Sequence, residues 1–203
     1  LHEAAASGHK EVAELLIVKG ANVNEKDKDG GTILHQTGFD EIAKLLIDKG
    51  AEVNAKTKDG NTPLHSAAMF NNKEIAELLI ANGADVNATD NKFGATSLYG
   101  AAGAGQKDIA ELLISNGAIV NAKIPRGDTA LHAAIMGGHK EVIELLITND
   151  ADENAKIMFG IAKEMTPLDI ANLTANPNKS IETADLLRKH GGKTAKELKA
   201  EGK

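Results

Sequence analysis

Seven histidines are the side chains of this 203-residue chain best suited to bind a metal or to transfer a proton near neutral pH. Six of them occupy two recurring positions. His2, His35, His65 and His132 each follow a leucine, and His9 and His139 each follow a glycine. A residue that recurs at the same place in successive copies of a motif indicates a structural role. We therefore expect neither a metal site nor a catalytic histidine.

The other reactive groups are also spread along the chain. Glutamates recur once per motif, at Glu14, Glu77, Glu111 and Glu144, so the pattern does not indicate the carboxylate pair of acid–base catalysis. The segment Gly103-Ala104-Gly105 is not followed by the Lys-Ser/Thr of a phosphate-binding loop. The chain has no cysteine, which excludes disulfides and thiolate zinc sites. These observations predict a protein that is not an enzyme and has no cofactor.

A longer phrase repeats along the whole chain. A leucine followed by His or Tyr precedes a Leu-Leu pair and then a Gly-Ala pair. The step from Leu64 to Leu98 is 34 residues, and the step from Leu98 to Leu131 is 33. Self-similarity at this period predicts a solenoid, in which recurring residues build the scaffold and variable residues carry function.

Each copy of the phrase carries the signals of two helices. Gly60 suits a turn with positive φ, Thr62 suits an N-cap, and Pro63 suits the first helical position. The second helix reads Ile75-Ala76-Glu77-Leu78-Leu79-Ile80, whose apolar residues form one core-facing stripe, and Gly83 suits its C-terminal cap. One helix pair cannot bury its stripe alone, so we expect the repeats to stack.

The segment Thr62-Pro63-Leu64-His65-Ser66-Ala67-Ala68 resembles the signature of the ankyrin-repeat family, and the resemblance runs from Leu1 to about Gly192. It implies an all-α ankyrin-repeat solenoid of about six helix–turn–helix repeats with β-turn fingers. It also implies that the histidine after leucine is buried and bonded to nearby backbone. We expect a single domain over 1–192 with repeats 1–26, 27–56, 57–89, 90–123, 124–156 and 157–192, and a C-terminal capping helix over 193–203. Because the chain opens inside the motif, we expect residues upstream to be missing.

The repeats are not uniform. Repeat two lacks three residues, from its first helix or from the turn around 36–39, and repeat four has one extra residue near Asn91. Repeat six has about four extra residues in its finger, over 157–165, and about four between its helices, over 173–179. Two interpretations remain open: drift on a tolerant scaffold, or the shaping of a particular binding surface.

The resemblance implies that partners bind on a concave face made of finger tips and the exposed side of each first helix. The residues at those positions are Lys58, Asp59, Asn61, Met69, Phe70, Lys92, Phe93, Pro125, Arg126, Asp128, Met136 and Phe159. Exposed aromatic and methionine side chains there would serve as binding anchors, although Phe93 and Phe159 could instead pack on neighbouring fingers. Lysines along the fingers could make a basic groove, or the interleaved aspartates could neutralise it.

Composition narrows the choice of partner. The net charge of −6 argues against nucleic-acid binding. The sequence has no run of eighteen apolar residues, so it does not predict a membrane span. We expect a monomer that binds a protein or peptide, with the cytoplasm as the default compartment. The alternative is a regulatory or targeting domain of a larger enzyme or effector whose catalytic part lies elsewhere. Uneven repeat lengths argue against a designed binder.

Overall fold

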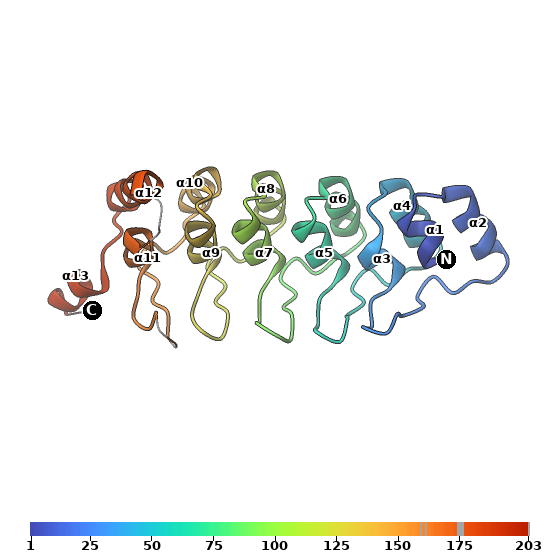
Figure 1. Ribbon diagram of the computed structural model, residues 1–203, viewed down its shortest axis with the longest axis horizontal. Coiled ribbons are helices and arrows are strands. Elements are labelled where there is room, and N and C mark those ends of the chain that lie inside the picture. Colours follow the sequence, from blue (N-terminus) through green and yellow to red (C-terminus); the bar gives the residue numbers. More distant parts are fainter. Residues whose placement is uncertain (159, 161, 174–176, 203) are drawn as a thin grey trace. The chain divides into compact units, whose positions relative to one another are not determined.

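The computed structural model describes residues 1–158, 160, 162–173 and 177–202. Within that part of the chain the regular elements are helices, and the β contact is a single antiparallel bridge between Lys26 and Thr32. The helices are α1 (His2–Ala6), α2 (Lys10–Val18), α3 (Ile33–Gln36), α4 (Asp40–Asp48), α5 (Pro63–Met69), α6 (Lys73–Ala81), α7 (Ser97–Ala104), α8 (Lys107–Ser115), α9 (Ala130–Gly137), α10 (Lys140–Thr148), α11 (Pro167–Leu173), α12 (Pro177–Lys189) and α13 (Ala195–Ala200) (Figure 1). The predicted all-α fold is confirmed.

The chain divides into two compact units, Leu1–Lys92 with α1 to α6 and Phe93–Lys203 with α7 to α13. Each unit is a row of helix pairs, with an extended finger leading into the first helix of a pair (Figure 1). First helices pack on one another, with α3 between α1 and α5 in the first unit and α9 between α7 and α11 in the second. One pair falls in each of the six predicted repeats, and α13 falls in the predicted tail.

Threonine and histidine together begin the first helix. At α3, the backbone N–H of Thr32 donates to Nδ1 of His35 over 3.1 Å, and the Thr32 hydroxyl lies 3.0 Å from the same nitrogen. Nδ1 is therefore the acceptor, so Nε2 carries the proton and donates to the carbonyl of Asn61 in the next finger, 3.0 Å away. The same capping box begins α5 and α9, where His65 and His132 are buried. The predicted structural role of these histidines is confirmed.

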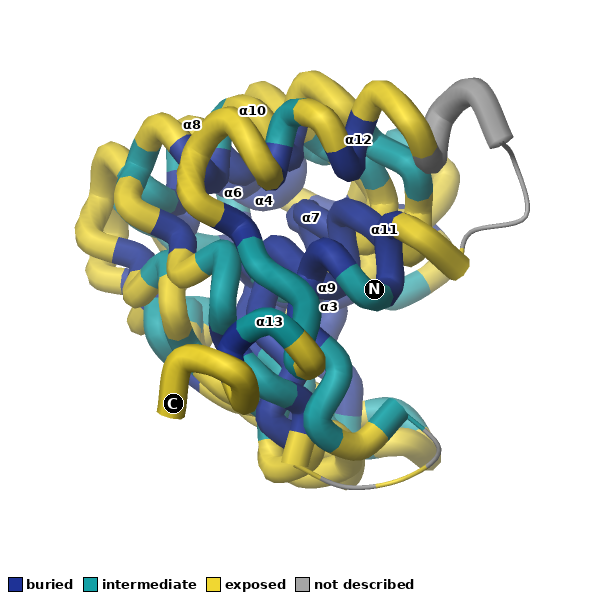
Figure 2. Tube along the Cα trace, turned by 90° about the vertical axis from the view of Figure 1, so that its left-hand side faces the viewer, coloured by how far each residue is buried: buried dark blue, intermediate teal, exposed yellow. Residues whose placement is uncertain are grey.

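The core of each unit lies within and between the helix pairs. Figure 2 shows buried segments mainly in the first helices, and exposed segments along the outer side of the second helices and at the finger tips. Ala67 and Ala68 are buried on α5, where their small side chains allow neighbouring helices to approach closely. The apolar stripe of α2 differs from the expectation: Val12 is 48% exposed, whereas its counterpart Ile42 is 1% exposed. The difference arises because α4, which carries Ile42, packs against α2 on one side and α6 on the other. In the described structure, α2 packs against a neighbouring pair on one side only.

A recurring asparagine joins each repeat to the next. The side chain of Asn24 donates to the carbonyl of Gly50 over 3.0 Å and accepts the backbone N–H of Glu52 over 2.8 Å. Asn54, Asn121 and Asn154 make the equivalent pair of bonds. The sequence indicated bonding within a turn, but these side chains bridge successive repeats and so contribute to interface stability.

The irregular repeats keep their second helices in place. The three residues lacking from repeat two are lost from the first helix, because α3 has 4 residues and α5 has 7. In repeat six, the residues 177–180 extend the start of α12, which has 13 residues whereas α10 has 9. Part of that inter-helix segment, 174–176, lies outside the described residues.

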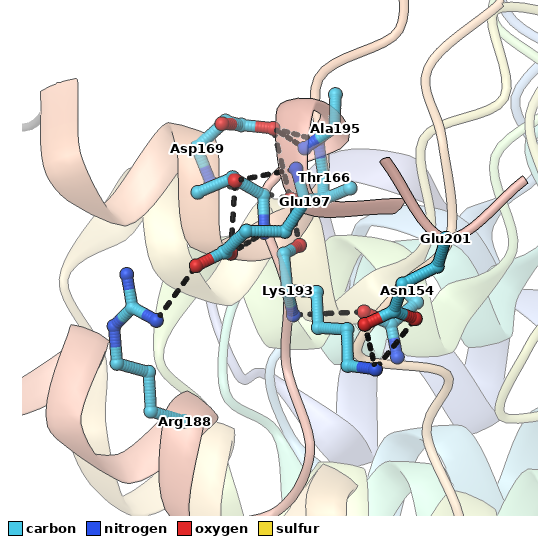
Figure 3. A network of polar contacts seen from close by, with 9 residues as sticks. Asn154, Thr166, Asp169, Arg188, Lys193, Ala195, Glu197 and Glu201 are labelled. Carbon is cyan, nitrogen blue, oxygen red and sulfur yellow. Dashed lines mark hydrogen bonds and ion pairs between the residues drawn. The ribbon is translucent and has the colours of Figure 1, made fainter. Parts of the chain in front are cut away.

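The C-terminal helix covers the last repeat through a polar network (Figure 3). Asp169 stands where other repeats have His, and its Oδ2 accepts the backbone N–H groups of Thr166 (3.0 Å) and Ala195 (2.9 Å). A carboxylate suits this place because Ala195 presents an N–H to Asp169. In repeat two, by contrast, Asn61 presents a carbonyl to His35. Leu198 is the buried residue of α13, and Arg188 pairs with Glu197 over 3.2 Å. Within the described residues, α13 therefore packs over the end of the last repeat.

Candidate partner-binding site

The finger of repeat three shows how the candidate residues are held. Thr57 N–H donates to the carbonyl of Asn61 over 3.0 Å, and Gly60 takes a φ of +81° between them, so the chain reverses tightly. The N–H of Lys58 donates to Asp29 of the preceding finger over 2.9 Å, and the carbonyl of Asp59 accepts the N–H of Asn91 over 2.7 Å. The backbone thus fixes the fingers of the first unit side by side, while the side chains of Lys58 and Asp59 are exposed.

Asn61 differs from the residues at the finger tip. It is half-buried, and its carbonyl accepts both the N–H of Thr57 and Nε2 of His35. Its backbone therefore belongs to the scaffold, although part of the residue reaches the surface. Lys92, in the next finger of the same unit, is exposed, and its N–H donates to Oδ1 of Asp90 over 2.8 Å.

Two large apolar side chains end α5. Met69 is 60% exposed and Phe70, the C-cap residue, is 68% exposed. Both belong to the first-helix layer, where neighbouring residues such as Leu64 and Ala68 are fully buried. Desolvating such exposed groups would stabilise a complex.

In the second unit, Phe93 is 59% exposed and Met136, at the end of α9, is 50% exposed. More than half of the surface of Phe93 is therefore accessible to solvent. Pro125 and Arg126 form the exposed turn of the following finger. Because proline has no N–H, finger five has no counterpart of the donor that Lys58 supplies to its preceding finger. Phe159 lies outside the described residues, and Met158 before it is 55% exposed.

Asp128 contradicts the expectation of an exposed finger residue. Its side chain is fully buried, and its two carboxylate oxygens each accept a hydrogen bond of 3.1 Å from the guanidinium of Arg126. Asp128 follows the finger turn and faces the interior near Tyr99, the residue that replaces histidine in repeat four. This pairing raises the pKa of Arg126, and burial raises the pKa of Tyr99. Asp128 thus orients Arg126 and cannot itself meet a partner at the surface.

Two other aspartates among the finger lysines, Asp27 and Asp90, also bond internally, whereas Asp29 and Asp59 are exposed. Oδ1 of Asp27 accepts the N–H groups of Asp29 and Gly31, both over 2.8 Å, and these bonds lower the pKa of Asp27. Asp90 is buried and accepts from Lys92. Lysine side chains, by contrast, are exposed at 26, 28, 56, 58, 92 and 123. At these finger positions the exposed ammonium groups outnumber the exposed carboxylates of Asp29 and Asp59, which favours the basic-groove interpretation within each unit.

Across the described residues, no group of three or more His, Cys, Asp or Glu side chains is placed to hold a metal ion. His139 instead lies 3.0 Å from the carbonyl of Gly103, with its Nε2 facing the end of α7. Its counterpart His9 is exposed.

Sequence reasoning missed one cavity in the first unit. It has a volume of about 300 Å³ and lies between the end of α3 and the side of α5. The signal was present in the sequence, because the three-residue deletion in repeat two shortens the helix that would otherwise occupy this place. Sequence alone did not show which side chains would line the space.

Comparison with known proteins finds a family match over residues 1–157. A family model for ankyrin repeats in three copies matches residues 1–90 and again 89–157. No curated protein matches the chain. In the described part of the chain, the helices are too short or too polar to span a bilayer.

Proposed function

Since the chain belongs to the ankyrin-repeat family, whose members are generally protein–protein interaction modules of a typically non-catalytic fold, we propose that it binds a protein or peptide through its finger and first-helix layer. The observation that carries this proposal is the position of five exposed methionine and phenylalanine side chains, whereas the exposed aliphatic groups Val12, Val18 and Ile181 lie on second helices. Met69 and Phe70 in the first unit, and Phe93, Met136 and Met158 in the second, all belong to fingers or to the ends of first helices.

The rigidity of the scaffold supports the same role. Finger turns are fixed by internal hydrogen bonds and by bonds to neighbouring fingers, so their side chains are held in place before a partner arrives. A preorganised surface loses little conformational entropy on binding. The buried Asp128 holds the guanidinium of Arg126 in one orientation, which suits recognition of a planar acceptor such as a carboxylate.

The charge pattern indicates the kind of protein surface. Lysines and Arg126 are exposed along the fingers, whereas Glu77, Glu111 and Glu144 are exposed on the second helices. A partner with an acidic or carboxylate-bearing segment beside an apolar one would complement the finger layer. Charge of this kind mainly accelerates association, and the apolar anchors would supply most of the affinity.

Affinity capture from lysate of the source cells tests the proposal. The bait is the full chain, compared with the triple variant Phe70→Ala/Phe93→Ala/Arg126→Ala. The matched control is Val18→Ala/Lys107→Ala/Ile181→Ala, which removes two exposed apolar groups and one exposed basic group from second helices. Circular dichroism first establishes that all three proteins are helical.

We expect one partner to be captured by the wild type and the control variant, and to be lost from the finger-layer variant. Retention by the finger-layer variant and loss from the control would move the site to the second helices. If the wild type and both variants are folded but none of them captures a protein, the result would argue against an interaction module.

A further inference from the structure

The cavity in the first unit arises where repeat two is short. In repeat three, α5 runs from Pro63 to Met69 and its turn follows at Phe70. In repeat two, α3 ends at Gln36, and Thr37 already has an extended backbone with ψ of 131°. The last turn of the first helix is therefore lacking on one side of α5, and the opening of about 300 Å³ lies there.

Carbon-rich side chains form the walls. Leu34 contributes from α3, Pro63, Ala67 and Phe70 from one side of α5, and Ile75 from α6. Pro63, Ala67 and Phe70 follow one another at intervals of four and three residues, which places them on one face of α5 and its C-cap. Phe70 is the exposed rim, while Leu34, Ala67 and Ile75 are buried. The opening thus leads from an exposed aromatic edge to an apolar floor.

The polar side chains that line the cavity are either bonded within the protein or free. Gln36 donates to Asp27, and the Thr37 hydroxyl accepts the N–H of Phe39. His35 has both ring nitrogens engaged, with Thr32 and with Asn61, and burial lowers its pKa, so it is neutral at pH 7. Ser66 and Asn72 also line the cavity, and their side chains make no hydrogen bond to another described residue. These two groups have free donors and acceptors at the opening. Among the described lining residues there is no Asp, Glu, Lys or Arg.

We propose that this cavity receives one uncharged aliphatic side chain, of the size of leucine or methionine, from the partner polypeptide, whose backbone bonds to Ser66 and Asn72. The proposal rests on the proposed function and adds the chemistry of one anchor residue. The volume is at the lower limit for ligand pockets, which suits a single side chain better than a larger ligand. A charged side chain would lose its hydration without gaining a counter-charge.

Methyl-resolved NMR of the full chain with N-acetyl-leucinamide as the probe tests the cavity directly. N-acetyl-argininamide and the α-amide of N-acetyl-aspartic acid, which keeps its side-chain carboxylate, are the charged comparators. We expect the leucine probe alone to shift the methyl signals of Leu34, Ala67 and Ile75 in a saturable way. The proposal is overturned if none of these methyl groups responds, or if the charged probes shift them equally.

Two substitutions at the cavity and one control substitution elsewhere test whether the probe binds in the cavity. Ser66→Leu fills the cavity from α5, and we expect it to weaken probe binding at least tenfold. Gly100→Leu is the matched control, because Gly100 holds the same position on the full-length α7, is exposed, and has no atom within 4 Å of a Cβ placed on it. Phe70→Ala, which removes the rim, should also weaken binding and leaves the buried floor unchanged. Equal binding by wild type, Ser66→Leu and Phe70→Ala would contradict the assignment.

Selection of randomised displayed peptides on the wild-type chain separates this proposal from the proposed function. We expect the selected peptides to share one Leu, Ile or Met and to lose at least tenfold in affinity for Ser66→Leu, but not for Gly100→Leu. Peptides that depend on Lys58 or Phe93 and are unaffected by Ser66→Leu would refute the anchor site and leave the interaction module standing. Saturable leucine binding without any selected peptide would support the cavity and count against the module.

Discussion

Acidification should destabilise this protein through His132. The side chain is fully buried at the start of α9, and desolvation lowers its pKa from 6.5 to about 4, against the opposing effect of Asp128 and Asp152. Its Nδ1 accepts the N–H of Thr129 over 3.1 Å, so Nε2 carries the proton. Unlike His35, whose Nε2 bonds to Asn61, His132 makes no hydrogen bond of normal geometry through Nε2 within the described residues, although the backbone of Ala155 lies near enough to oppose the fall in pKa.

Folding stability decreases on acidification because the unfolded chain takes up more protons than the folded chain. In the unfolded chain this imidazole titrates near 6.5, whereas in the folded chain it stays neutral down to about 4. Between these values the unfolded state binds more protons, so stability is highest above pH 6.5 and falls as the pH is lowered towards 4. A difference of about 2.5 pKa units corresponds to about 3 kcal/mol over the full range, of which about 2.5 kcal/mol is lost between pH 7 and pH 4.5.

His132→Gln removes the titrating group and keeps the cap, because glutamine at the third helical position completes a capping box with Thr129. Urea unfolding followed by circular dichroism at pH 7.0 and 4.5 gives the stability difference for each protein. We expect the variant to lose about 2.5 kcal/mol less than the wild type on acidification. His190→Gln, which replaces an exposed histidine, is the control and should follow the wild type.

Two results would refute the reasoning. One is an identical acid loss in the wild type and His132→Gln. The other is a titration of the His132 ring proton, followed by NMR in the folded state, with a midpoint near 6.5. Either result would mean that the ring is hydrated or has a hydrogen-bond acceptor for Nε2.

Three further predictions concern the scaffold. Asn121→Ala removes the two bonds of 2.7 and 2.8 Å that join repeats four and five, and should cost about 1–2 kcal/mol in urea unfolding; an unchanged midpoint would contradict the bridging role. Gly105→Ala should cost more than Gly20→Ala in the same assay, because both have positive φ but only at Gly105 would the added Cβ lie 2.5 Å from a histidine ring. The carboxylate of Glu197 accepts from Thr194, which lowers its pKa to about 2. Hydrogen-exchange protection of the Leu198 amide should therefore persist at pH 4.5 and decline as the pH falls towards 2, and Glu197→Gln should show no such decline.

The repetition of short-range signals is what made the fold predictable. A glycine with positive φ, a threonine cap and a proline at the first helical position act within a few residues of one another, so the sequence determined where helices such as α5 begin. The period then determined which residues occupy equivalent places. The structural role of His35, His65 and His132 followed from that equivalence alone.

Tertiary structure decided which of the variable residues reach the surface. Asp128 aligns with the half-exposed Asn61, yet it is buried because Arg126 turns back to pair with it. The recurring asparagines bond across repeats, over 26 to 39 residues of sequence, a distance at which no local pattern reports a partner. The cavity beside α5 likewise depends on the space between two helices. The sequence determined that three residues are lacking from repeat two. Only packing decided that the gap remains open and is lined by Leu34, Phe70 and Ile75.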